Sequence, residues 1–210
     1  MTDFISPLTE LDAVNTLLTT IGEAPINTLE GGETLSPDAQ IARDILRRAS
    51  RTIQSEGWPW NTDIRMELVP DVNGEILIPF NAIRINIDED DIGFTRSFTR
   101  KGTIVQRGRK LYDRYNNTFK IDQTLFADVV TLLDFEDLID PARDLITYRA
   151  ARLFQDSIQA DNALHAFTNE EMAFARAQLE QASYAAGDFN MLRNDPTTVD
   201  IAFRFTRRRT

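Results

Sequence analysis

Apolar residues recur at three- and four-residue spacing in two segments near the start of the chain, which predicts two amphipathic helices. The first is expected over about Thr9–Ile21, because its first residue and Asp12 have capping-box spacing and Gly22 can end it. The second is expected to begin at Ser36-Pro37, a cap followed by proline, and to end at Gly57. The residues expected to be buried are Leu11, Val14, Leu17, Leu18 and Ile21 in the first helix, and Ile41, Ala42, Ile45, Leu46, Ala49 and Ile53 in the second.

From Trp58 to about Phe135 the apolar period changes to two, which is the spacing of β-strands. Turn-forming residues divide this stretch at 71–74, near Gly102, at Gly108 and at 116–117. We therefore expect a meander of short antiparallel strands, with hairpins that project from the helical body, and a loop at Asp88–Asp91. The alternating apolar residues are Ile64, Met66 and Leu68, followed by Ile83, Ile85 and Ile87.

Helical spacing returns after the strands. A third helix is expected to start at Asp140-Pro141, and a fourth to run from about Thr168, with a capping box to Glu171, to Ala186. Because each helix has one apolar face, the four helices should form one body. In the third helix the residues at helical spacing are Leu145, Ile146, Arg149, Leu153, Phe154 and Ile158, and in the fourth one face is lined by Met172, Ala175, Leu179 and Ala182.

The last residues have no helical period but alternate between apolar and polar types, ending in Arg207–Arg209. A solvated tail does not need that alternation, whereas an added strand or a groove-bound peptide does. We therefore predict that this arm reaches outside its own subunit, with its arginines pairing with acids there. The candidate inter-subunit residues are Val199, Ile201, Phe203 and Phe205.

The order of these elements predicts an α+β fold. A helical bundle from the N- and C-terminal segments carries an inserted antiparallel β region and an extended C-terminal arm. The predicted division is a discontinuous helical body at 1–60 and 136–192, a β-rich insertion at 61–135 and an arm at 193–210.

Composition narrows the class of protein. The chain has 210 residues, a net charge of -10 and a pI of about 4.6, which argue against a free nucleic-acid-binding domain. It has no cysteine, which excludes disulfides, thiolate metal sites and a cysteine nucleophile. The start of the sequence lacks the pattern of a signal peptide, and no apolar run is long enough to cross a membrane. We expect folding in a reducing cytoplasm and no membrane partner.

The charge is unevenly distributed along the sequence. Residues 94–120 contain eight basic residues and one acid, whereas residues 134–188 contain eleven acids and four arginines. Two oppositely charged surfaces suit self-association or docking on a charged neighbour. The candidate docking surface is Arg107, Arg109 and Lys110. Aromatic residues nearby, Phe94, Phe98 and Tyr112, leave nucleic-acid binding as the alternative.

Candidate chemistry is sparse. His165 is the only histidine and is expected to be structural, and neither a phosphate-binding glycine loop nor a serine nucleophile elbow is present. We therefore expect no catalytic residue, no cofactor and no metal site. The alternative is a carbohydrate hydrolase that uses paired carboxylates from Asp134, Glu136, Asp137 and Asp140, or from Asp88–Asp91. Trp58 and Trp60 could form a sugar platform, but such residues more often fill a helix–sheet junction.

Several ordered motifs resemble the tail tubular protein A family of podoviruses, phages with short non-contractile tails. The opening "LDAVNTLLTTIGEAPINTLEG" covers 11–31, and "ARDILRRASRTIQSEGW" covers 42–58. Near the end, "RAARLFQ" at 149–155 and "GDFNML" at 187–192 also match. These segments lie at both ends of the chain, in the regions 11–58 and 149–192, which together cover about half of its length. The stretch from about 61 to 127 resembles the family only in its strand-rich character.

The resemblance implies a structural virion protein of the phage tail, assembled in the host cytoplasm. Twelve copies would form a ring that joins the portal protein to the nozzle made of tail tubular protein B, with tail fibres attached near the junction. Double-stranded DNA would pass through the ring during ejection without specific binding, since an acidic lumen repels phosphates. Polysaccharide degradation has been proposed for some family members, so a tail-associated polysaccharide or peptidoglycan hydrolase is the alternative function.

Overall fold

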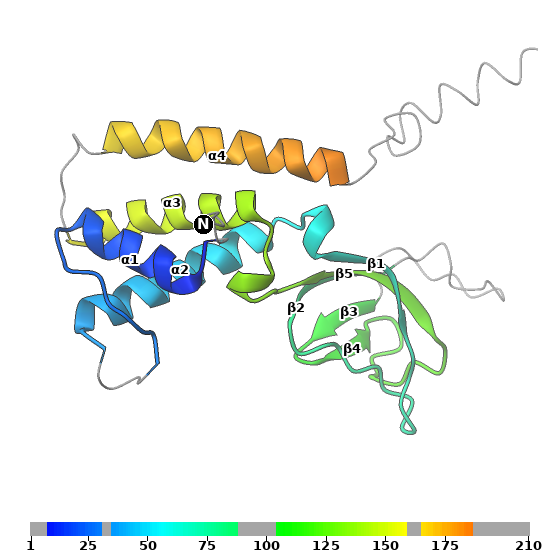
Figure 1. Ribbon diagram of the computed structural model, residues 1–210. Helices are drawn as coiled ribbons and strands as arrows, with labels where there is room; N and C mark the ends of the chain where they lie inside the picture. Colours follow the sequence, from blue (N-terminus) through cyan, green and yellow to red (C-terminus); the bar gives the residue numbers. More distant parts are fainter. Residues whose placement is uncertain (1–7, 31–34, 88–103, 159–164, 187–210) are drawn as a thin grey trace, which may run out of the picture.

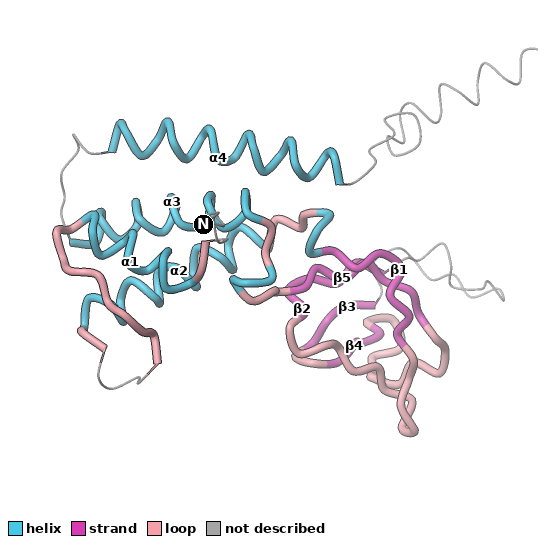
Figure 2. The backbone as a smooth tube through the Cα atoms, in the orientation of Figure 1, coloured by secondary structure: helices cyan, strands magenta, loops and turns pink. Residues whose placement is uncertain are grey.

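Helices from both ends of the sequence pack against one another in the computed structural model, and the strands lie at one end of this helical body (Figures 1 and 2). The structure describes residues 8–30, 35–87, 104–158 and 165–186. This arrangement confirms the predicted α+β class. The helices are α1 (Glu10–Thr20), α2 (Pro37–Gln54), α3 (Asp140–Ile158) and α4 (His165–Ala186).

The predicted starts of the first two helices are confirmed by their capping contacts. The Thr9 side chain accepts a hydrogen bond from the Asp12 backbone N–H, and the Asp12 carboxylate accepts one from the Thr9 backbone N–H. The Ser36 hydroxyl accepts from Ala39 at the start of α2, where Pro37 is the first helical residue. These contacts satisfy backbone donors that the first turn of a helix leaves unpaired.

Helix α3 lies between its neighbours and packs against α1, α2 and α4 (Figure 1). The predicted burial of Leu17, Leu18, Ile45, Leu46 and Phe154 in the bundle is confirmed.

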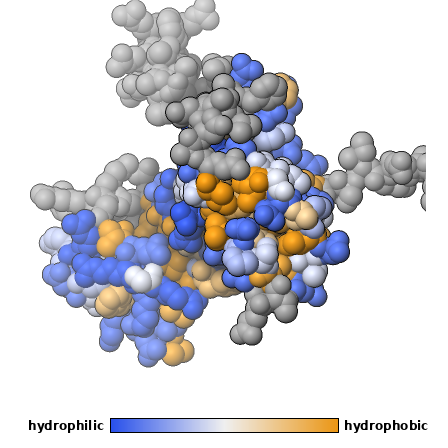
Figure 3. Space-filling model, turned by 90° about the vertical axis from the view of Figure 1, so that its left-hand side faces the viewer, coloured by the Kyte–Doolittle hydropathy of each residue, from blue (hydrophilic) through white to orange (hydrophobic). Residues whose placement is uncertain are grey.

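The prediction for Leu153 was wrong, because its side chain is 39% exposed. The buried positions of α3 follow 142, 146, 150 and 154 on one side and 147, 151 and 155 on the next, and Leu153 falls outside both sides. The stripe predicted from the sequence therefore overlaps the buried face of α3 only in part. Ile41 and Ile158 are also exposed, and Figure 3 shows apolar side chains among hydrophilic ones on the face toward the left of Figure 1.

The last helix begins earlier than predicted. Helix α4 starts at His165, so Thr168 lies within the first turns and does not cap the helix. Ala166 and the residues that follow extend the helical backbone, because nothing between His165 and Thr168 breaks it. Its predicted apolar face is confirmed: Ala175 and Leu179 are buried, and Met172 packs against the core.

The strands form two antiparallel sheets, and the predicted meander is wrong. The larger sheet has the order β1-β5-β2, so its central strand is the last in sequence. β5 alternates between buried and half-buried residues, and its length lets it pair on both edges. The strands are β1 (Thr62–Leu68), β2 (Ala82–Ile87), β3 (Ile104–Arg107), β4 (Lys110–Asp113) and β5 (Leu125–Thr131).

A bulge changes the face that β1 presents. The β1–β5 register shifts between Asp63 and Met66, and Arg65 has a positive φ of 55°. The Arg65 backbone N–H donates to the Asp128 carboxylate at 2.9 Å, which supports this conformation. Ile64 is consequently 75% exposed instead of lying on the inner face with Met66 and Leu68.

The second sheet is the β3–β4 hairpin, which turns at Gly108 as predicted. The segment before β2 adds to it, because Ile76 and Ile78 exchange backbone hydrogen bonds with Leu111 and Arg109. Both isoleucines are buried in a second core, which the spacing of apolar residues in the sequence did not predict. The members of this core are Leu68, Ile76, Ile78, Leu111, Ile121, Leu125, Ala127 and Val129.

Two buried amide side chains join the helical body to the sheet. The Gln54 side chain donates to the Leu133 carbonyl at 3.0 Å and accepts from the Leu133 N–H at 2.8 Å. Asn61 donates to the carbonyls of Gln54 and Thr131, and accepts from the Trp58 N–H. Because buried polar groups need partners, these contacts hold the end of α2 against the exit of β5.

Helix α3 contains two neighbouring ionisable side chains, Asp144 and Tyr148, whose pKa values are shifted. Burial, and then the charge of Asp140, raise the pKa of Asp144 above its ordinary value. Burial and the charges of Asp144 and Glu171 likewise raise the pKa of Tyr148. Ionised Asp144 is therefore less favourable in the folded protein than in the unfolded chain.

Asp144→Asn is expected to raise the denaturation midpoint at pH 7. Because the folded-state pKa of Asp144 is raised, its favourable protonated form is complete below the unfolded-state pKa of about 4 and is lost as pH rises. The gain should therefore disappear toward pH 4. Asp44→Asn, at an exposed position of α2, is the matched control, and an equal gain in both variants would contradict the prediction.

Candidate functional site

The predicted docking residues lie on and beside the β3–β4 turn. Among the described residues, Arg107 and Lys110 have side-chain partners. The Arg107 guanidinium stacks over the Tyr112 ring, 3.6 Å from its centroid. Lys110 pairs with Glu75 on the adjoining segment. The Arg109 side chain is exposed, while its backbone carbonyl accepts a hydrogen bond from Ile78. The hairpin therefore presents Arg109 on a turn that its neighbours hold in place.

In the folded protein, the basic residues around the β3–β4 hairpin belong to the same strand-bearing part as the acidic residues of the other strands. The described strand-bearing residues, 62–87 and 104–131, contain seven acids and seven basic residues. The described helical segments contain sixteen acids and eight arginines. Among the described residues, the excess of acids therefore belongs to the helical body, and the sheet end is close to neutral with Arg109 at a turn.

Several of the clustered carboxylates considered for hydrolysis lie where the helical body meets the sheet, around a short 3-10 helix at Phe135–Asp137. The Glu136 carboxylate accepts a hydrogen bond from the Glu10 backbone N–H at 3.3 Å. Asp140 lies 3.7 Å from the Arg143 guanidinium. Both carboxylates thus make structural contacts at helix starts, where negative charge is favourable.

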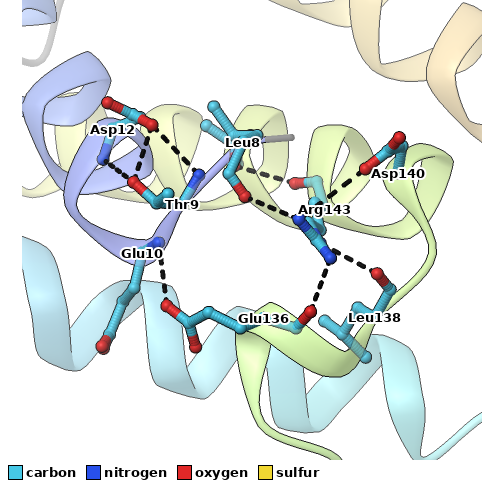
Figure 4. Close-up of polar contacts among 9 residues, drawn as sticks. Leu8, Thr9, Glu10, Asp12, Glu136, Leu138, Asp140 and Arg143 are labelled. Atoms are coloured by element: carbon cyan, nitrogen blue, oxygen red, sulfur yellow. Dashed lines mark hydrogen bonds and ion pairs between the residues drawn. The ribbon is translucent and has the colours of Figure 1, made fainter. Parts of the chain in front are cut away.

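Arg143 organises this junction (Figure 4). Its guanidinium donates to the backbone carbonyls of Leu138 at 2.8 Å, Leu8 at 3.0 Å and Glu136 at 2.6 Å. The side chain is only 11% exposed. One arginine therefore connects Leu8, which precedes α1, with the 3-10 helix and α3. Its position within a predicted helix did not indicate this role.

A groove of about 670 Å³ opens beside this junction. Part of its lining is apolar, and Phe80, 85% exposed, stands at its edge. Phe80 is not among the candidate residues of the sequence, because a local pattern does not indicate which aromatic side chain will lie beside a groove. The lining comprises Glu10, Leu46, Arg47, Ser50, Arg51, Phe80, Asn81, Leu132, Leu133, Asp134, Phe135, Glu136 and Asp137.

The two tryptophans fill the helix–sheet junction and do not form an open platform. Both are half-buried against the helical core. The Trp58 indole N–H donates to the Ile53 carbonyl at 3.0 Å, and Arg176 of α4 lies over its ring. Arg176 also bonds to Glu56, so α4 is attached to the end of α2. This arrangement confirms the structural interpretation of Trp58.

Other candidates lie outside the described residues. These include the arm residues Val199, Ile201, Phe203 and Phe205, the acidic stretch 88–91, and Phe94 and Phe98. The side chain of His165 is also outside the described part. Within the described ranges, no group of three or more histidine, aspartate or glutamate side chains is arranged to hold a metal ion. No described helix is both long and apolar enough to cross a membrane.

Comparison with known proteins identifies the family. The model of the family described as Tube, tail tubular protein, matches residues 11–189, which is most of the chain and includes all described helices and strands from Leu11 onward. No curated protein matches the sequence. The chain therefore belongs to the tail tubular protein family and is a structural component of a bacteriophage tail.

Proposed function

We propose that this protein is a ring-forming tail adaptor of the A type in a podovirus, with twelve copies joining the portal protein to the nozzle of tail tubular protein B. The observation that carries the proposal is the family match over residues 11–189. The motifs at both ends of the chain, described above, resemble the A type in particular. Tail fibres would attach near the nozzle, and the particle would be assembled in the host cytoplasm.

The uneven charge of the molecule supports a ring. In a cyclic ring each subunit uses two different surfaces, one for each neighbour. An acidic helical body and a near-neutral sheet end with an exposed Arg109 are two such different surfaces. Acidic residues facing a central channel would also keep DNA mobile during ejection, because they repel its phosphates.

The purified full chain should form a discrete large particle, alone or after mixing with portal protein. Mass photometry or native mass spectrometry would measure the number of copies. The expected result is a single ring species whose mass is an integer multiple of the subunit mass, close to twelve. A chain that remains monomeric both alone and with portal protein would overturn the proposal.

The basic hairpin is proposed as the surface that docks on the nozzle or a fibre. Arg109→Glu should weaken co-sedimentation with nozzle protein, and added salt should weaken the wild-type contact, because exposed charges are screened. The triple reversal of Arg107, Arg109 and Lys110 should have a larger effect, although it also disturbs the contacts to Tyr112 and Glu75.

Arg48→Glu, at an exposed position of α2, is the matched control for this charge reversal. The docking proposal requires that Arg48→Glu leave co-sedimentation unchanged. If Arg109→Glu leaves tail assembly intact but abolishes binding of duplex DNA, the hairpin is a nucleic-acid surface instead.

A further inference from the structure

The groove beside the 3-10 helix combines an apolar lining with an acidic edge. Its apolar side chains are Leu46, Phe80, Leu132, Leu133 and Phe135. Phe80 is 85% exposed, so most of a phenyl ring meets solvent at the groove edge in the isolated chain. Large exposed aromatic groups beside a groove are typical of sites that bind a partner segment.

The charged side chains of the groove have an acidic excess. Glu10 is paired with Arg47 at 3.4 Å and with Arg43 at 3.2 Å. Within the described part of the chain, the carboxylates of Asp134 and Asp137 make no hydrogen bond or ion pair. With Glu136, the lining holds four carboxylates against the two guanidinium groups of Arg47 and Arg51. A positively charged segment would therefore be attracted to the edge formed by 134–137.

We propose that the C-terminal arm of a neighbouring copy of this chain occupies the groove; this inference rests on the proposed ring. The arm carries apolar side chains at every second position, which suits one side of an extended peptide lying on an apolar lining. Three arginines follow directly, at 207–209, and match the acids at 134–137. The arm thus combines apolar side chains with a cationic end, and the groove combines an apolar lining with an acidic edge. The apolar residues are Val199, Ile201, Phe203 and Phe205.

The position of α4 favours a neighbour over the same subunit. Helix α3 lies between α2 and α4, and the groove is lined by the α2 side of the body (Figure 1). The arm follows α4 in the sequence, and α4 packs on the opposite side of α3 from the groove. Residues 187–210 could span up to about 80 Å when extended, so their length permits contact with a groove on an adjacent subunit as well as on the same one, and the cross-linking experiment below distinguishes the two.

Cross-linking of full-length variants tests the assignment, because the chain contains no native cysteine. Ser50→Cys places a thiol in the groove, and Thr206→Cys places one in the arm without removing an apolar residue. A short bismaleimide should join the double variant into a ladder of linked subunits. The matched control combines Thr206→Cys with Arg48→Cys, which is exposed on the same helix but does not line the groove.

Adding Asp134→Lys and Asp137→Lys to the double variant should reduce the ladder severalfold, because the edge of the groove would then repel the arginines. A cross-link confined within single subunits would overturn the assignment to a neighbour. An equal ladder with the Arg48→Cys control would show that the groove is not specific, and would overturn it too.

Particle mass, measured on the same samples before cross-linking and with portal protein present, separates the two proposals. An intact ring without the ladder overturns the groove assignment and leaves the adaptor proposal standing. A ladder that stops at dimers supports arm exchange but overturns the closed ring. A monomer that gives no cross-link overturns both.

Discussion

Phe154→Ala is expected to destabilise the protein by about 3–5 kcal/mol, the range for truncating a buried phenylalanine. Phe154 is fully buried and belongs to α3, the helix that contacts each of the other three. Removing its ring forfeits apolar burial and leaves a cavity that close-packed neighbours cannot fill. Since domains of this size are stable by about 5–15 kcal/mol, the loss would be a large part of the total.

Leu153→Ala is the matched control, one residue away on the same helix. Its side chain is 39% exposed, so its truncation should cost at most about 1 kcal/mol. Denaturant unfolding followed by circular dichroism would measure both values. If Phe154→Ala does not fold, Phe154→Leu should still cost clearly more than Leu153→Ala. Equal losses at the two positions would contradict the described packing of α3.

Arg143→Met is expected to cost about 3–5 kcal/mol and to loosen the segment beside the groove. The substitution removes three charge-assisted bonds to the carbonyls of Leu8, Glu136 and Leu138, each worth roughly 1.5–3 kcal/mol, and water replaces part of this loss. The methionine keeps much of the length of the side chain, so the effect reports on hydrogen bonding more than on volume.

Two further variants test the cause. Arg143→Lys keeps the charge but not the forked guanidinium, so its loss should be intermediate. Arg149→Met, on the same helix, should cost about 1 kcal/mol or less. Hydrogen exchange should become faster at 135–139 in Arg143→Met and stay unchanged in Arg149→Met. Uniform exchange in all variants would mean that Arg143 does not hold this segment.

The position of these residues matters for the proposed assembly. Asp134, Glu136 and Asp137 belong to the segment that Arg143 holds, and this segment forms the acidic edge of the groove. Arg143→Met should therefore weaken arm capture even at temperatures where the protein remains folded. An Arg143→Met variant that folds and cross-links like its parent would show that arm capture does not depend on the Arg143 contacts.

Helix positions, the α+β class and the family resemblance could be determined from the sequence because they depend on local signals. Capping by Thr9 and Ser36, the turn at Gly108 and the stripes around Leu17 and Leu46 involve residues within a few positions of one another. The strand-rich middle was likewise visible from its period of two. The family match over residues 11–189 confirmed that the chain is a tail tubular protein, which is the broader part of the resemblance.

Only the tertiary structure decided which residues meet across long sequence separations. The central place of β5, the Gln54–Leu133 exchange and the Arg143 contact to Leu8 join residues far apart in the sequence. Periodicity does not determine which edge of a strand is paired. It also does not determine which residues of a helix packed between neighbours stay exposed, as Leu153 of α3 does. Pairing and packing depend on the competition among all apolar faces at once, which a local pattern does not contain.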